Sequence, residues 1–416
     1  MSTSTQSTSQ AKKSTLASAQ VGALTTQGWL LILLVFMAGA CSLSVEVSAS
    51  RLLAPYFGDT LFVWANLIGL ILLYLTIGYY VGGRFADRYP RARVLYTLTG
   101  CAALFIALIP WLSHPVLSWT QSAFASNPLG VFYGSLVSVI LLFVVPTVLL
   151  GCVSPFAIRL RVEQVGKSGS ISGKLYAIST IGSILGTFLP VFLFLPNIGT
   201  AKTFFISGVV LLLVSLLGWL TAPSQAQARI SADAQTAPAV QEDRKRVQTR
   251  APFAGYSLQS WLLMLLVFVE GACALAVEIS ASRLLAPYFG TSLFIWANLI
   301  GLILLYLTIG YYVGGRFADR YPSATVLYTL TIVAAFLIAL IPLIARPILA
   351  WSQSSFLTYS VGVFYGSLVS VILLFAVPVI LLSCVSPFAI RLQVEQVGRS
   401  GSISGKLYAI STAGSI

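Results

Sequence analysis

Long uninterrupted apolar runs constrain this chain more than any other feature of its sequence. One run begins at Trp29 and passes Ala40, and another extends from Leu61 to Gly83. Runs of about 18 or more apolar residues are long enough to cross a bilayer as a helix. Only helices and closed barrels satisfy their backbone hydrogen bonds in lipid, and these runs lack the alternation of barrel strands. The sequence therefore predicts an all-α, polytopic integral membrane protein.

The chain contains the same unit twice in tandem. The segment Glu46–Gly58 recurs as Glu278–Gly290, 232 positions later, and the alignment continues without a gap. An even number of spans per unit gives both copies the same orientation, so we predict a parallel repeat. The second copy stops at Ile416, which corresponds to Ile184 inside an apolar run. We therefore expect a truncated second copy and about ten or eleven transmembrane helices in all.

The apolar runs and the repeat set the expected boundaries. The first copy predicts six spans at about 29–54, 61–83, 94–112, 130–158, 174–196 and 202–221. The second copy predicts four at about 259–286, 293–315, 326–345 and 362–390, and a partial span from about 406. We expect four parts: a disordered cytoplasmic tail over 1–28, a six-helix membrane unit over 29–222, a flexible cytoplasmic linker over 223–257 and an incomplete membrane unit over 258–416.

Basic residues concentrate in alternate loops of the first copy. They follow the second and fourth predicted spans: Arg84, Arg88, Arg91, Arg93, Arg159, Arg161, Lys167 and Lys174. The positive-inside rule places these loops, the linker and the N-terminus in the cytoplasm. The same rule explains the net charge of +13 without a nucleic-acid partner.

Acidic and amide side chains occur inside the predicted spans. Glu46 lies in the first span and Asn66 at a similar depth in the second, so a Glu46–Asn66 contact is reasonable. Glu278 and Asn298 repeat this arrangement in the second copy. Intramembrane acids are costly and mark cation or proton sites by default, although a buried helix-packing network is the alternative. We expect the arginines five residues after these acids to extend to the outer interface: Arg51 and Arg283.

Glu270 distinguishes the second copy from the first. It lies about ten residues into its span, near the expected bilayer centre, and Ala38 occupies the equivalent position in the first copy. No basic residue of the same span lies at its depth. We expect Glu270 to be either a protonated acid or part of a cation or proton site.

A loop of the form G-x-x-x-D-R follows the second span of each copy. The first copy has Gly83, Asp87 and Arg88, and the second has Gly315, Asp319 and Arg320. This loop resembles the one between the second and third helices of major facilitator transporters. A carboxylate there can hold cationic groups or helix ends in one conformation, which predicts a gating loop that latches and unlatches. The alternative is a solvated basic turn that only sets topology.

The sequence offers no cofactor or metal site. The five cysteines contain no C-x-x-C pair and all lie in apolar segments, which indicates small buried residues. The segment Gly166–Leu175 resembles a phosphate-binding loop only superficially, because Leu175 replaces the Ser/Thr and the spacing of the glycines is wrong. We expect no catalytic residue and no cofactor.

Several repeated stretches together resemble one bacterial family. They are E-[VI]-S-A-S-R-L-L-A-P-Y-F-G, F-[VI]-W-A-N-L-I-G, G-Y-Y-V-G-G-R-F-A-D-R, V-S-P-F-A-I-R-L and G-K-L-Y-A-I-S-T. The chain resembles the transmembrane region of fused major facilitator/spermidine synthase proteins, over residues 29–221 and again over 261–416. In that family a soluble aminopropyltransferase domain usually follows the membrane region. The nucleotide-binding glycine loop and acidic amine pocket of that domain are absent from this sequence.

The resemblance implies a multi-pass protein of the bacterial cytoplasmic membrane that is not itself an enzyme. We expect a transporter-like module for a polyamine or another organic cation. The alternative is a non-transporting anchor or channelling module whose partner is a separate aminopropyltransferase domain. Beyond the lipid bilayer, the expected partners are therefore an organic cation or such a synthase domain.

Overall fold

The computed structural model describes residues 4–222, 258–356 and 362–416, with no side-chain description for residues 4–26, 61, 293 and 294. The first half contains α1 (Ser4–Phe57), α2 (Leu61–Arg88), α3 (Ala92–Ala123), α4 (Gly130–Gly151), α5 (Val153–Arg161), α6 (Ser168–Leu189) and α7 (Leu195–Thr221). The second half contains α10 (Leu258–Phe289), α11 (Leu293–Arg320), α12 (Ala324–Phe356), α13 (Gly362–Ser383), α14 (Val385–Gln393) and α15 (Ser400–Ser415). Predicted linker residues 223–257 lie outside the described part.

The described helices confirm the prediction of an all-α, multi-pass membrane protein. Nine helical stretches in the described ranges are long and apolar enough to cross a membrane. One of them, Val165–Thr221, contains two predicted spans, because Gly199 interrupts it with a positive φ of 80°. The sixteen-residue α15 is the predicted partial span. The count therefore agrees with the expected ten or eleven spans.

The repeat is visible in the bounds of the helices. The bounds of α2, α4 and α5 recur in α11, α13 and α14 after a shift of 232 positions. The turn after α1 needs Gly58 at φ 76°, and the equivalent turn after α10 needs Gly290 at φ 81°. Glycine adopts this left-handed conformation without the steric cost of a side chain, which explains the glycine that ends each repeated A-P-Y-F-G motif.

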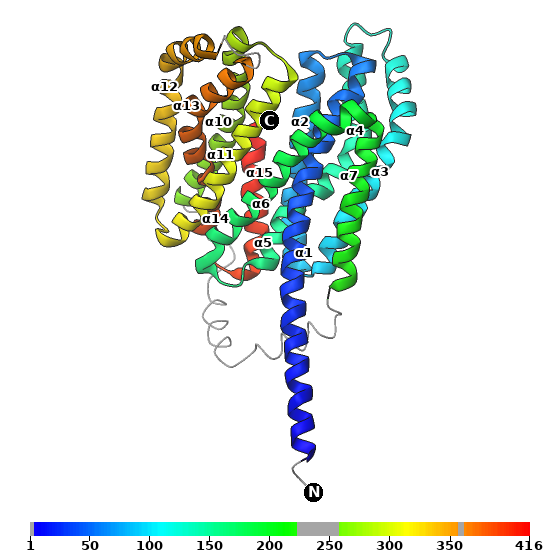
Figure 1. Cartoon of the computed structure of the whole chain (residues 1–416), viewed down its shortest axis with the longest axis vertical. Helices are drawn as coiled ribbons and strands as arrows, with labels where there is room; N and C mark the ends of the chain where they lie inside the picture. The colour runs from blue at the N-terminus through cyan, green and yellow to red at the C-terminus, as the bar shows by residue number, and fades with distance from the viewer. Residues whose placement is uncertain (1–3, 223–257, 357–361) are drawn as a thin grey trace.

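The N-terminal boundary differs from the expectation. The structure continues α1 as a helix back to Ser4, where we expected a disordered tail over residues 1–28. This segment contains no proline, so no residue in it prevents the helix of the first span from propagating beyond the apolar run. The extension leaves the bundle at the N-terminal end of α1 (Figure 1).

Two helix pairs join the halves. Helix α2 packs along α15, and α6 packs along α11, and these pairs are equivalent under the repeat. Figure 1 shows α6 and α15 in the middle of the molecule, with α10, α12 and α13 on one side and α3, α4 and α7 on the other. Within each half, α1 packs on α6, as α10 packs on α15. The interface therefore has approximate two-fold symmetry.

We name the two ends of the bundle by their residues. The basic end carries the C-termini of α2, α5, α11 and α14 and the residues between α5 and α6, and it is the lower end in Figure 1. The far end carries the turns at Gly58 and Gly290.

Candidate functional site

At the basic end, Asp87 contacts the N-terminus of a helix from the other half. Its Oδ1 accepts a hydrogen bond from the Gly401 backbone N–H at 3.0 Å, and its Oδ2 accepts one from Ser402 at 2.7 Å. The Arg159 Nε lies 3.1 Å from Oδ1. A helix N-terminus presents unsatisfied N–H groups and a partial positive charge, so a carboxylate is stabilised there.

Asp319 makes the equivalent contact in the opposite direction. Its carboxylate accepts hydrogen bonds from the backbone N–H groups of Gly169 at 3.0 Å and Ser170 at 2.8 Å, at the start of α6. The Arg391 Nε lies 3.3 Å from Asp319 Oδ1. We call these two arrangements the aspartate contacts. Each half thus supplies one carboxylate to the other half, and both contacts join the halves at the basic end.

Glycines allow the helices to meet closely beside these carboxylates. A Cβ added to Gly83 would overlap the Gly401 carbonyl oxygen and lie 3.1 Å from the Gly405 Cα. A Cβ added to Gly315 would likewise overlap the Gly169 carbonyl oxygen. The repeated G-x-x-x-D-R motif therefore combines a close-packing glycine with a carboxylate one turn later on the same helix face.

The motif arginines lie elsewhere. Arg88 and Arg320 are exposed, and each guanidinium lies over the ring of the next residue, Tyr89 at 5.7 Å and Tyr321 at 5.6 Å. The cations beside the aspartates come instead from α5 and α14, and sequence reasoning missed Arg159 and its equivalent in this role. A signal was present, because the second copy keeps this arginine but replaces Arg161 with glutamine.

Each half carries one of the predicted intramembrane acids, Glu46 and Glu278. Glu46 lies on α1 and Glu278 on α10, at equivalent positions of the repeat, and both are partly buried. Among the described residues, neither carboxylate has a salt bridge to a basic side chain. Two like charges without a fixed counter-ion in an apolar bundle form an arrangement that a cation or a proton would stabilise.

The expected contact between Glu46 and Asn66 is wrong. The Asn66 side chain instead donates hydrogen bonds to the Phe132 carbonyl and the Ser135 hydroxyl of α4, both at 2.9 Å. Asn298 donates in the same way to the Ser367 hydroxyl at 3.0 Å. The asparagines are buried on the face of α2 or α11 that packs within its own half, so they belong to the helix-packing network.

The remaining polar residues of the predicted site take separate positions. Arg51 and Arg283 are exposed near the far-end termini of their helices. Glu270 is 5% exposed and accepts a hydrogen bond from the Ser411 hydroxyl of α15 at 3.0 Å. Glu270 precedes Glu278 by eight residues, or about 12 Å along α10, and therefore lies closer to the basic end.

Four tyrosines meet where α2, α6, α11 and α15 converge. The ring centroids of Tyr79 and Tyr408 are 4.9 Å apart, those of Tyr176 and Tyr408 are 4.1 Å apart, and those of Tyr176 and Tyr311 are 5.0 Å apart. Tyr79 and Tyr311 lie one turn before Gly83 and Gly315. The rings therefore form a packed layer next to the aspartate contacts.

An aromatic contact also joins the halves at the far end. Trp64 of α2 and Trp296 of α11 stack with ring centroids 6.4 Å apart and an interplanar angle of 10°. The Trp64 indole also donates to Asp59 at 2.6 Å. The two halves therefore touch at both ends of the bundle in this structure.

The described residues contain no group of three or more His, Cys, Asp or Glu side chains that could hold a metal ion. Glu46 and Glu278 are therefore considered below as sites for an organic cation or a proton rather than for a metal ion.

Comparison with known proteins agrees with this architecture. No family model matches the chain. Two curated relatives from Ralstonia nicotianae, Polyamine aminopropyltransferase 2 and Polyamine aminopropyltransferase 1, are each 26% identical over 180 residues, or 43% of this chain. That match spans only about a third of each relative, 33% and 32%.

A solved structure defines the fold class. The major facilitator superfamily proton:xylose symporter XylE superposes with a TM-score of 0.54 at 15% identity, over 94% of this chain and 86% of the symporter. The chain is thus a multi-pass membrane protein with a fold like that of this symporter, and at this identity the likeness extends to the fold alone.

Proposed function

We propose that the chain is a transporter-like module for a polyamine or another organic cation. The observation that carries this proposal is that the equivalent acids Glu46 and Glu278 are partly buried within the spans of the two halves and have no salt bridge among the described residues. A linear amine with separated positive charges suits two carboxylates in an apolar surrounding, because it neutralises both. The names of the aminopropyltransferase relatives support a polyamine as the cation.

In this proposal the aspartate contacts gate the basic end. They hold α15 and α6 against α2 and α11, so they stabilise the conformation in which the basic end is closed. Opening that end requires both carboxylates to release their helix N-termini, which is a two-state change of the kind that alternating access needs. Glu270, between the acid pair and the tyrosine layer along α10, is the third cation or proton site of the proposal.

We further propose that the basic end and the N-terminus face the cytoplasm of a bacterial cell. The support is the concentration of arginine and lysine in the loops at that end. The far-end turns carry few charges by comparison, with Asp59 the acidic residue beside Gly58.

Uptake of labelled spermidine into proteoliposomes tests the function. We expect uptake above that of empty vesicles, and a loss of at least about tenfold in Glu46→Gln and in Glu278→Gln, because each removes one of two charges that face the substrate. Glu270→Gln is expected to reduce uptake as well.

The exposed acid Glu395 provides the matched control, since Glu395→Gln removes the same charge outside the bundle. Uptake equal to that of empty vesicles in every sample would contradict transport. Equal uptake in the parent, Glu46→Gln and Glu278→Gln would contradict the role of the acid pair.

The second candidate function is a membrane anchor for an aminopropyltransferase domain. The observation that favours it is the identity of the curated relatives. Protein isolated from native membranes under mild conditions would then carry aminopropyl transfer from decarboxylated S-adenosylmethionine to putrescine, while showing no uptake. Uptake without copurifying transferase activity would exclude the anchor.

A further inference from the structure

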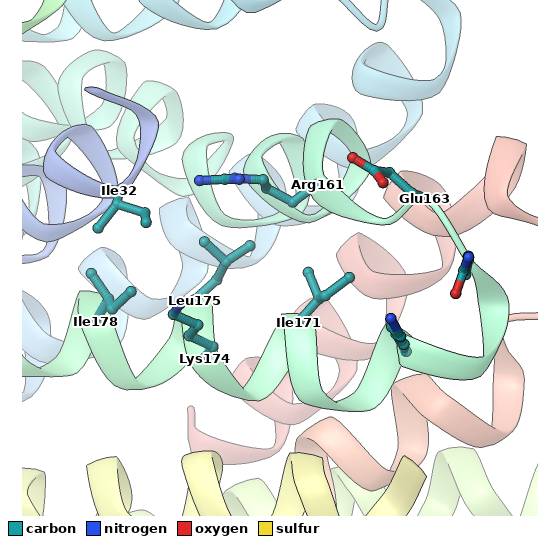
Figure 2. A pocket seen from close by; sticks show the side chains of 9 residues that line it. Ile32, Arg161, Glu163, Ile171, Lys174, Leu175 and Ile178 are labelled. Atoms are coloured by element: carbon teal, nitrogen blue, oxygen red, sulfur yellow. The ribbon is translucent and has the colours of Figure 1, made fainter. Parts of the chain in front are cut away.

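A pocket lies at the basic end of the first half, between α1, α5 and α6 (Figure 2). Its volume is about 300 Å³. Three cationic side chains and one acidic side chain line it: Arg161, Lys167, Lys174 and Glu163. The pocket is separate from the aspartate contacts and from the acid pair, so the proposed transport mechanism does not use it.

None of the three cations that line the pocket has a salt bridge among the described residues. Lys167 and Lys174 are exposed, and neither forms a salt bridge within the described residues. The Arg161 Nη2 donates a hydrogen bond to the Gly28 carbonyl at 2.6 Å, which fixes the guanidinium beside α1. Figure 2 shows Arg161 extending toward Ile32 above the row of side chains on α6. The guanidinium has further N–H donors, so it suits a phosphate oxygen.

The α6 wall of the pocket carries apolar side chains beside Lys174 and continues into the membrane span. Ile171, Leu175 and Ile178 line the pocket in a row along α6 (Figure 2). Beyond them the same helix exposes large apolar side chains at spacings of three and four residues: Ile181 (43%), Leu185 (41%) and Leu189 (40%). Residues at these spacings share one helix face, so the apolar stripe leads from the pocket away from the basic end.

We propose that this pocket binds an anionic phospholipid. The phosphate lies among Arg161, Lys167 and Lys174, and an acyl chain follows the α6 stripe from Ile171 toward Leu189. Basic pockets between transmembrane helices recognise anionic lipid head groups, which matches these cations. A free phosphate ion would use the cations but leave the apolar side chains of α6 without a ligand, so the cations and the apolar stripe together favour a lipid.

The second half supplies a natural contrast. There Gln393 replaces Arg161 and Met264 replaces Ile32, although Arg399 retains the charge of Lys167. The equivalent position therefore lacks the cation that the first half fixes beside α1. The lipid site belongs to the first half only in this proposal.

Native mass spectrometry of the full chain in detergent tests the site. The probes are phosphatidylglycerol, phosphatidylcholine, glycerol phosphate and inorganic phosphate, each titrated separately. We expect selective retention of phosphatidylglycerol, with apparent affinity lowered about fivefold by Arg161→Gln and by Lys174→Gln, since each removes one cation near the head group. Arg399→Gln is the matched control, because it removes an exposed cation at the equivalent place in the second half.

Each outcome decides the proposal. Retention of phosphatidylglycerol that falls in Arg161→Gln and Lys174→Gln but not in Arg399→Gln supports it. Equal retention of the two phospholipids, or equal loss in all three variants, overturns the site. Binding of glycerol phosphate or inorganic phosphate as tightly as phosphatidylglycerol overturns the lipid assignment. Elution of each variant at the parental volume in size-exclusion chromatography ensures that only folded protein is compared.

Discussion

At the scale of single residues, Asp87 and Asp319 act as helix caps supplied by the other half. No side chain of their own caps the N-termini of α6 and α15, where Lys167 and Arg399 occupy the N-cap positions. Each aspartate instead accepts the second and third N–H groups of the helix, the donors that a local N-cap side chain would satisfy. The same hydrogen bonds therefore stabilise a helix end and join the two halves.

Asp87→Asn is expected to weaken the closed basic end. The amide keeps the shape of the side chain but loses the charge that Arg159 and the α15 N-terminus stabilise, at a cost of about 1.5–3 kcal/mol. We expect the closed population to fall about tenfold or more. Spin labels at Arg88→Cys and Arg399→Cys, one exposed site on each half, report the opening as a longer distance in double electron–electron resonance.

The repeat makes this prediction testable a second time. Asp319→Asn should produce an opening similar in size to that of Asp87→Asn, because its contacts have equivalent partners under the repeat and similar lengths. Glu395→Gln, an exposed acid of the second half, is the control and should leave the distance unchanged. An unchanged distance in both aspartate variants would mean that the aspartate contacts do not hold the basic end closed.

At the scale of helices, close approach of α6 to α11 and of α2 to α15 depends on glycine. A Cβ at Gly173 would overlap the Tyr311 carbonyl oxygen and lie 3.1 Å from the Gly315 Cα. The obstruction is backbone on both sides, which cannot turn away as a flexible side chain can. In membranes, helix association relies on such close packing because lipid is as apolar as the helices.

Gly173→Ala should therefore separate α6 from α11 and destabilise the protein by about 1–3 kcal/mol. The measurement is the apparent melting temperature of the purified protein in detergent. Gly69→Ala is the matched control, because Gly69 lies within α2 and a Cβ there meets nothing within 4 Å. That control should keep or slightly raise stability, since alanine favours a helix over glycine by about 1 kcal/mol. Equal melting temperatures for the two variants would contradict the close-packing argument.

At the scale of the whole molecule, the halves meet near both ends of the bundle. The aspartate contacts and the tyrosines lie at the basic end, the acid pair lies within the spans, and the stack of Trp64 on Trp296 lies at the far end. The two acids therefore lie between contacts that join the halves near both ends of the bundle. This arrangement suits a carrier that exposes its site to one side at a time.

The acid pair makes a prediction about the whole molecule. In a chain whose native cysteines are replaced, Glu46→Cys with Glu278→Cys should cross-link with a short bifunctional maleimide. A protease site introduced within residues 223–257 then separates the halves, so a cross-link is seen as a band of undivided size on a denaturing gel.

Glu46→Cys with Ile279→Cys is the control, because Ile279 is 50% exposed and lies about 100° around α10 from Glu278. Cross-linking of both pairs to the same extent, or of neither pair, would contradict the meeting of Glu46 with Glu278.

Individual residues show which features of the fold and the site were predictable from the sequence. The span lengths, the repeat and the glycine-aspartate motif are local patterns, so the helices and the importance of Asp87 were predictable. The partner of Asp87 was not, because Gly401 lies 314 positions away and its backbone N–H leaves no mark on the sequence. Asn66 failed as a predicted partner of Glu46 because depth in a span does not say which face of the helix it occupies.

The sequence by itself determined that the chain is a duplicated helical membrane protein. Hydrophobic length and composition act through the solvent, and a bilayer accepts such segments only as helices. The tertiary structure alone decided which groups come together: the aspartates with helix N-termini of the other half, Trp64 with Trp296, and Arg161 with α6 in the pocket of the first half. These contacts depend on how the helices rotate and cross when they pack. That geometry is a property of the assembled bundle rather than of any one segment.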